Sequence, residues 1–137
     1  MERFERSGGM RGRAASVIVA AVLVGATWFG PARGAEEMPY DDRLAELAET
    51  LGALHHLRPL CGAPEAQTWR DQMNAVLEAE QPSRERRQRL VDRFNQSYRS
   101  LAAAHRTCDP AARALVEIYR TRGEALGADL VARWGHP

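Results

Sequence analysis

The spacing of apolar residues constrains the fold of this 137-residue chain more than any other feature of its sequence. Downstream of residue 40, apolar residues recur every three or four positions in four successive segments. This spacing places them on one face of a helix. The predicted stripes consist of Leu44, Leu47, Leu51 and Leu54; of Ala66, Trp69, Met73, Val76 and Leu77; of Leu90, Val91, Phe94, Tyr98 and Leu101; and of Leu115, Ile118, Tyr119, Leu126 and Leu130.

Prolines and capping residues predict where these helices begin and end. The first helix is expected to open at Asp41 and Asp42 and to end at residue 58, because the residue before a proline avoids the α region. Ser83 and the Asp109-Pro110 pair are expected to open the third and fourth helices. The glycines at positions 123 and 127 predict a kink or an early end in the fourth. The four expected segments are residues 41–58, 64–81, 84–108 and 110–134.

The fold that follows from these segments is all-α. Each stripe covers only part of its helix, so the helices must pack against one another. Valine and isoleucine, which strands favour, are scarce downstream of residue 34. Short connections favour antiparallel neighbours. We therefore expect a small antiparallel four-helix bundle over residues 41–135, preceded by a short extended lead-in over residues 35–40.

The first 34 residues have the pattern of a secretory signal peptide. Arginines at positions 3, 6, 11 and 13 precede an uncharged, mostly apolar run over residues 14–30, and small residues follow it. This order predicts export, with cleavage after Gly34. Met10 is an alternative start to Met1. A second interpretation is an uncleaved inner-membrane anchor over residues 14–30, although this run is short for a bilayer of about 30 Å. Either interpretation places the helical domain outside the cytoplasm, with a periplasmic location expected.

Two cysteines are expected to form a disulfide across the bundle. Cys61 follows the first predicted helix and Cys108 closes the third, and an up-down bundle places those two ends on the same side. Two cysteines in an exported domain usually pair. The alternative is a redox-active pair, which normally sits close together in sequence.

Several polar residues fall on the apolar faces. His55 and Arg58 share the face of the first leucine stripe, His105 lies on that of the third segment, and Arg122 lies between Ile118 and Leu126. A buried arginine needs a partner, and Glu80 and Asp129 are the candidates. These groups either satisfy one another near the bundle ends or line a pocket that binds an anion. The arginine-rich run over residues 84–89 is either a solvated face or a patch for an acidic partner.

The sequence does not predict an enzyme, a cofactor or a metal site. No lysine is present, which excludes Schiff-base and P-loop chemistry, and no nucleophile and base stand in a familiar motif. His55 and His56 are adjacent, so on a helix they diverge by about 100° and cannot chelate together. The near-neutral net charge of +1 argues against nonspecific binding to nucleic acid.

Short motifs give the chain a resemblance to a known family. The sequence contains YDDRLAELAETLGALHHLRPLCG, then WRDQM, then RFNQSYR and a single later cysteine. Over residues 40–135 it resembles a group of small exported proteins from alphaproteobacteria whose function is unknown. Ser97 departs from the pattern, in which a smaller residue such as glycine is expected. The resemblance implies an exported helical domain with a cysteine pair, and it carries over no catalytic residue.

Two arginines within these motifs are candidates for contacts with a partner. Arg70 lies at the edge of an apolar stripe, and Arg99 points about opposite to the predicted core. We therefore expect a noncatalytic interaction or adaptor domain that binds another envelope protein. The alternative is a module that binds a small anion or a cell-wall fragment through Arg58, His55, His105 and Arg122.

Overall fold

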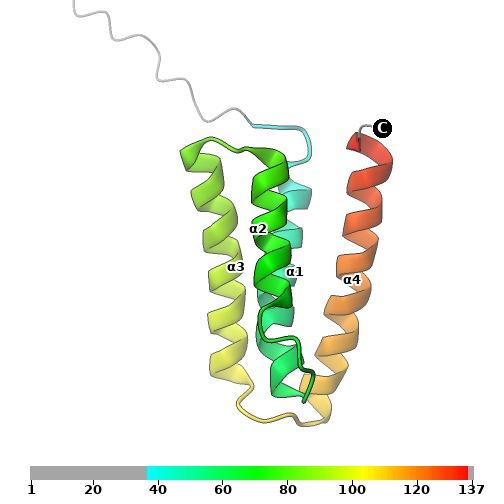
Figure 1. Cartoon of the computed structure of the whole chain (residues 1–137). Coiled ribbons are helices and arrows are strands. Elements are labelled where there is room, and N and C mark those ends of the chain that lie inside the picture. The colour runs from blue at the N-terminus through cyan, green and yellow to red at the C-terminus, as the bar shows by residue number, and fades with distance from the viewer. Residues whose placement is uncertain (1–36, 136–137) are drawn as a thin grey trace, which may run out of the picture. The chain divides into compact units, whose positions relative to one another are not determined.

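Four α-helices make up the domain, in a computed structural model that describes residues 37–135 (Figure 1). They are α1 (Asp41–Leu60), α2 (Thr68–Glu80), α3 (Arg84–Ala104) and α4 (Pro110–Trp134). No strand occurs among residues 37–135, so the predicted all-α, four-helix architecture is confirmed. None of the helices in this part of the chain is long and apolar enough to cross a membrane. The predicted signal segment, its cleavage point and the alternative anchor lie outside the described residues.

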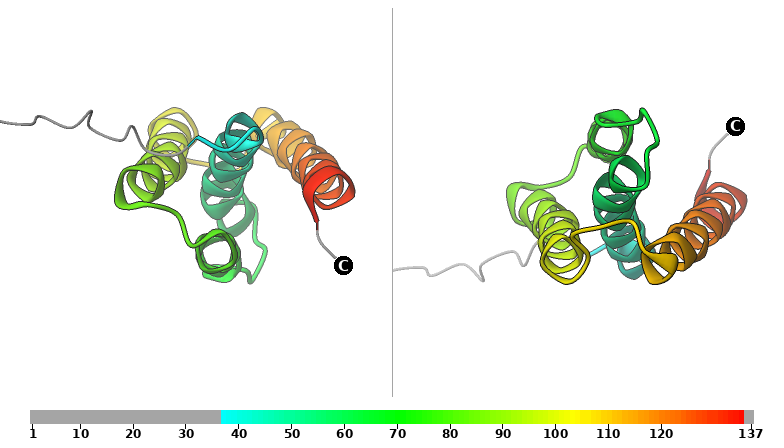
Figure 2. Two further views of the ribbon diagram at one scale, coloured as in Figure 1. Left: turned by 90° about the horizontal axis from the view of Figure 1, so that it is seen from above. Right: turned by 90° about the horizontal axis from the view of Figure 1, so that it is seen from below.

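Helix α1 is the centre of the arrangement. The other three helices all pack against it, with α3 and α4 on opposite sides and α2 on a third side (Figure 2). Successive helices run up and down, as expected. Three gaps therefore surround α1: between α2 and α3, between α2 and α4, and between α3 and α4. The residues that line them differ in charge and polarity.

The predicted helix boundaries need several corrections. Helix α1 continues through Pro59 to Leu60, and in the turn that follows the Arg58 and Pro59 carbonyl oxygens accept hydrogen bonds from the Ala63 and Gly62 N–H groups. Helix α2 begins four residues later than expected, and α3 ends before Cys108. Residues 39–40 form a turn where an extended lead-in was predicted, closed by a 3.0 Å hydrogen bond from the Asp41 N–H to the Met38 carbonyl oxygen.

Two of the three predicted caps are confirmed. Ser83 Oγ accepts a hydrogen bond from the Arg86 N–H at 3.3 Å, and Asp109 Oδ1 accepts one from the Ala112 N–H at 2.7 Å. Tyr40 is the N-cap of α1, and it makes no side-chain capping bond. Asp41 was predicted to cap this helix, but it lies in the first turn and its carboxylate binds other groups.

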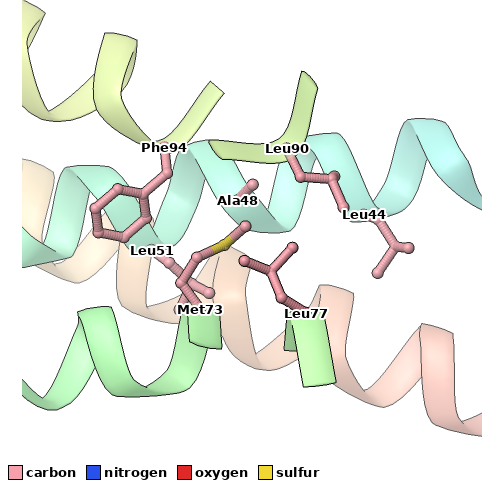
Figure 3. Close-up of a cluster of buried hydrophobic side chains, with 7 residues drawn as sticks. All are labelled: Leu44, Ala48, Leu51, Met73, Leu77, Leu90 and Phe94. Atoms are coloured by element: carbon pink, nitrogen blue, oxygen red, sulfur yellow. The ribbon is translucent and has the colours of Figure 1, made fainter. Parts of the chain in front are cut away.

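The main core lies where α2 and α3 pack on α1 (Figure 3). Its side chains converge from the three helices, and each is at most 6% exposed. This burial confirms the leucine stripe of the first segment as the centre of the fold. The cluster consists of Leu44, Ala48, Leu51, Met73, Leu77, Leu90 and Phe94.

A second core cluster lies at the disulfide end of the bundle. Leu57 of α1 packs there with Ala112 and Val116 of α4. The predicted bond between Cys61 and Cys108 is present, with the two Cα atoms 5.0 Å apart. It joins the C-terminal end of α1 to the residue before the cap of α4.

Helix α4 continues to Trp134, so it does not end early at Gly123 or Gly127. A Cβ atom on Gly123 would lie 3.2 Å from Thr50 Cγ2 of α1, so this glycine allows close packing between the helices. Ile118 was predicted to face the core, but it is 59% exposed. The face of α4 that packs on α1 instead carries the smaller Ala112 and Val116 together with Leu126.

Candidate interaction surfaces

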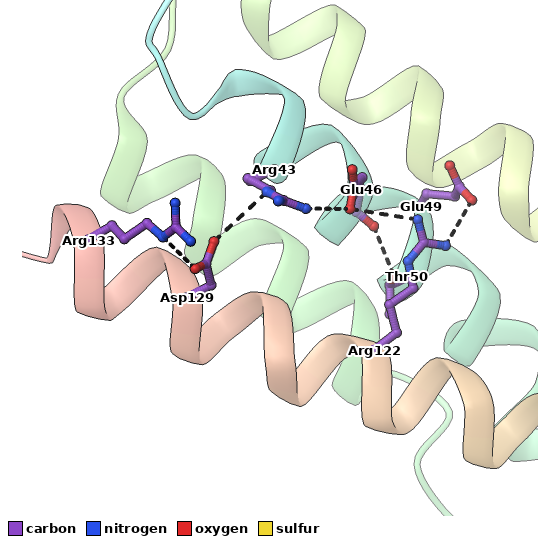
Figure 4. A network of polar contacts seen from close by, with 7 residues as sticks. All are labelled: Arg43, Glu46, Glu49, Thr50, Arg122, Asp129 and Arg133. Carbon is purple, nitrogen blue, oxygen red and sulfur yellow. Dashed lines mark hydrogen bonds and ion pairs between the residues drawn. The ribbon is translucent and has the colours of Figure 1, made fainter.

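A row of ion pairs joins α4 to α1 (Figure 4). Arg122 of α4 donates to Glu49 at 3.3 Å and lies 3.9 Å from Glu46, both on α1. Asp129 was one of two candidate partners for Arg58 and Arg122, but it pairs instead with Arg133 at 2.6 Å and with Arg43 at 3.9 Å. Thr50 is fully buried and donates to the Glu46 carbonyl oxygen. These contacts fix α4 to α1 and leave Arg122 occupied.

A buried arginine ties together the ends of three helices. Arg86 is 5% exposed, and its guanidinium donates to Asp41 of α1 at 2.6 Å and to Glu80 of α2 at 2.8 Å. Burial alone would lower the pKa of Arg86, but the two carboxylates outweigh it and the pKa is raised. This corrects two expectations: the arginine run is not wholly solvated, and Glu80 is not a partner of Arg58 or Arg122.

Arg58 is held by the loop that follows α1. Its Nε donates to Glu65 Oε2 at 2.8 Å, and its Nη2 pairs with Glu65 Oε1. The hydrogen bond from Arg58 lowers the pKa of Glu65. Trp69 Nε1 is buried without a hydrogen bond of normal geometry, although it lies close enough to Glu65 to lower the same pKa slightly.

His55 lies between α1 and α3 among aromatic rings. Its ring centroid is 5.5 Å from that of Phe94 and 5.3 Å from that of Tyr98. Its Nδ1 is buried and has no hydrogen-bond partner in the described part of the chain. Burial lowers the pKa of His55, and the charge of Arg70 and the neighbouring His56 lower it further. This shift favours the neutral form of the imidazole.

His105 is not on the apolar face of α3, because the helix ends at Ala104 and His105 is extended. Its carbonyl oxygen lies 2.7 Å from Nε2 of His56. The four residues of the predicted anion pocket thus have separate surroundings: Arg58 binds Glu65, Arg122 binds acidic residues of α1, His55 packs against aromatic rings, and His105 is in the α3–α4 loop. Among residues 37–135, no group of three metal-ligating side chains could hold a metal ion.

The gap between α2 and α4 is an apolar groove. Two adjoining hollows of about 340 Å³ and 390 Å³ form it, and both are lined by Leu47, Val76 and Gly127. The floor belongs to α1, and we call this surface the α2–α4 groove. Leucines 44, 47, 51 and 54 make the floor; Thr68, Trp69, Gln72, Val76, Ala79 and Glu80 make the α2 wall; and Arg120, Gly123, Glu124, Gly127, Leu130, Val131 and Trp134 make the α4 wall, with Tyr40 and Gly135 completing the lining.

The gap between α2 and α3 is a smaller hollow of about 250 Å³, here called the α2–α3 hollow. Its floor is apolar, and its rim carries Arg70 and Asn74 of α2 and Asn95 of α3. Arg99 is exposed beyond this rim, with its Nε donating to the Asn95 carbonyl oxygen at 3.1 Å. Of the sequence-predicted contact residues, Arg70 alone lines this hollow.

Neither of these surfaces was predicted from the sequence. Gly127 could have indicated the groove, because a glycine that faces neighbouring helices has no side chain to fill the space between them. Asn74 follows Arg70 by four residues and therefore lies on the same face of α2, which could have indicated the hollow.

Comparison with known proteins identifies the family and gives no activity. No curated protein and no solved structure matches the chain. The model of a family described as "Protein of unknown function (DUF2385)" matches residues 39–134. This match confirms the resemblance to a family of unknown function, and because it spans most of the sequence, the chain belongs to the DUF2385 family.

Proposed function

We propose that this protein is an exported, noncatalytic interaction domain that binds another protein of the bacterial envelope. The α2–α4 groove is the observation that carries this proposal. We further propose that the groove receives an amphipathic helix of the partner. The Cys61–Cys108 disulfide supports the exported location, because such bonds persist in oxidising compartments.

The shape of the groove favours a helix over an extended segment. Its floor runs along α1 between the α2 and α4 walls, so a helix lying in it would pack along α1 with its side-chain ridges between the two walls. From Leu44 to Leu54 the floor extends about 15 Å, enough for about three turns of a helix. No exposed strand edge is available among the described residues to pair with an extended peptide.

The walls of the groove leave room for the side chains of a partner. A Cβ atom on Gly127 would meet no atom within 4 Å, and Val131 on the same wall is 70% exposed. Each leucine-sized side chain that a partner buried there would contribute about 1.5–3 kcal/mol before the cost of association. Three such anchors are typical of helix-in-groove recognition.

Photo-cross-linking in the native host tests this proposal. A photoreactive amino acid at Val131, which lines the groove, is compared with one at exposed Ala132, which does not. We expect one recurrent envelope protein to cross-link at position 131 and not at position 132. Gly127→Leu fills open space without a backbone clash and should abolish the cross-link, whereas Ala128→Leu on the exposed side should not. Equal cross-linking from both positions, or none, would contradict the proposal.

A further inference from the structure

The α2–α3 hollow has the construction of a small ligand site. Its floor is formed by apolar side chains, three of which belong to the core. Its rim has one cation, Arg70, and two amides, Asn74 and Asn95. The floor residues are Met73, Leu77, Val91 and Phe94. Ligand sites combine an apolar lining with a few convergent polar groups in this way.

The rim groups are available for binding. Within residues 37–135, neither the guanidinium of Arg70 nor the side-chain amides of Asn74 and Asn95 take part in a hydrogen bond or an ion pair, and Arg99 bonds only the backbone oxygen of Asn95. Arg58, Arg86 and Arg122, by contrast, are all paired with carboxylates. Arg70 therefore differs from these three arginines, because its charge has no partner in the described part of the chain.

We propose that the α2–α3 hollow binds a small carboxylic acid with an apolar body and an amide group. The planar guanidinium of Arg70 matches a carboxylate, to which it donates two parallel hydrogen bonds. The amides of Asn74 and Asn95 both donate and accept, so they complement an amide of the ligand. The apolar body then lies on the floor. An N-acyl amino acid has all three features, and so does the C-terminal end of a peptide.

The size of the hollow limits the ligand. At about 250 Å³ it is smaller than the pockets of about 300–1,000 Å³ that enclose drug-sized ligands. It therefore accommodates one residue of a peptide, or a free acid of that size, and the rest of a longer ligand would extend into solvent. This site lies on the opposite side of α2 from the α2–α4 groove, so it is independent of the function proposed above.

Titration by NMR tests the site on the purified protein, in the form in which its host produces it. The probes are N-acetyl-L-alanine, N-acetyl-D-alanine and an N-acetylated tetrapeptide of uncharged residues that ends in alanine. Their uncharged counterparts, two methyl esters and the amidated tetrapeptide, are the controls. We expect at least one acid to shift the side-chain amide signals of Asn74 and Asn95 saturably, and its uncharged counterpart to leave them unchanged. If either N-acetyl-alanine binds, the ligand is a free acid. If only the tetrapeptide binds, the ligand is the C-terminal end of a peptide.

Two matched arginine variants complete the experiment. Arg70→Gln should weaken binding by about tenfold or more, because it removes a charge-assisted pair. Arg99→Gln, on the exposed side of α3, should bind as the unmodified protein does. Both positions are exposed, so neither variant should unfold, and circular dichroism checks this. No saturable shift with any acid, equal binding of acid and ester, or full binding by Arg70→Gln would overturn the proposal.

Discussion

The backbone of Gly52 in α1 lies against the backbone of Phe94 in α3. A Cβ atom on Gly52 would be 2.1 Å from the Phe94 carbonyl oxygen, far inside the contact distance of two nonbonded atoms. The obstacle is main chain, so no side-chain rotation can relieve it. The two helices therefore cross in direct contact, and this contact brings His55, one turn beyond Gly52, against Phe94 and Tyr98.

This contact predicts that two glycine-to-alanine substitutions act in opposite directions. Gly52→Ala should destabilise the domain by about 1–3 kcal/mol, because α1 and α3 must move apart. Gly127→Ala should stabilise it by about 0.5–1 kcal/mol, because a Cβ atom there meets nothing within 4 Å and alanine favours the helix. Urea unfolding of both variants measures the difference. Equal stabilities would show that the two helices can adjust at Gly52.

Reduction of the disulfide should destabilise the domain without changing its fold. Cys61 and Cys108 are separated by 47 positions, and closing a loop of that length is worth up to about 4 kcal/mol in chain entropy. We expect a reductant to lower the melting temperature clearly. The Cys61→Ser, Cys108→Ser double variant should already have the lower value and should not respond to the reductant. Reaction of both cysteines with a thiol reagent in the folded, unreduced protein would refute the bond.

Arg86 should matter far more to stability than its neighbour Arg84. Replacing Arg86 with methionine removes the buried cation that Asp41 and Glu80 share, and breaking such a pair costs about 3–5 kcal/mol. Arg84→Met changes an exposed residue and should cost less than about 0.5 kcal/mol. Adding Glu80→Gln to Arg86→Met should recover part of the loss in chemical denaturation. A variant at Arg86 as stable as the one at Arg84 would contradict the role of the pair.

The fold could be predicted from the sequence because its determinants are local. Apolar spacing, the caps at Ser83 and Asp109, and the positions of the two cysteines each act within one helix or at its end. The errors arise where tertiary contacts outweigh a local preference. Pro59 remains helical beside the disulfide-linked turn, and Gly123 marks close packing against Thr50 where the local preference indicated a kink.

The candidate surfaces could not be predicted in the same way, because they depend on which helices become neighbours. Periodicity placed Arg58 and Arg122 on inner faces but could not choose among several carboxylates. Neither candidate, Glu80 or Asp129, binds either arginine, because Arg58 pairs with Glu65 and Arg122 with Glu49. Arg86 lies within a run of exposed arginines, and only the meeting of three helix ends buries it. The groove exists because α2 and α4 flank α1 with space between them, and the hollow exists because α2 and α3 do the same.

Finally, His55 should make stability depend on pH in the mildly acidic range. Burial first, then Arg70 and His56, lower its pKa below the ordinary value of 6.5, so the unfolded chain takes up the proton more readily. The stabilisation is complete above pH 6.5 and is lost as the pH falls from 6.5 through the pKa of the folded state. Glu65, whose pKa is lowered from 4.5, loses its contribution only at more acidic pH, so the two effects separate.

His55→Phe keeps a ring beside Phe94 and Tyr98 and removes the titrating group, so its unfolding free energy should change less between about pH 7.5 and pH 5. The matched variant His105→Gln, in the loop after α3, should keep the dependence of the unmodified protein. If His55→Phe shows the same pH dependence as the unmodified protein, the titrating group lies elsewhere.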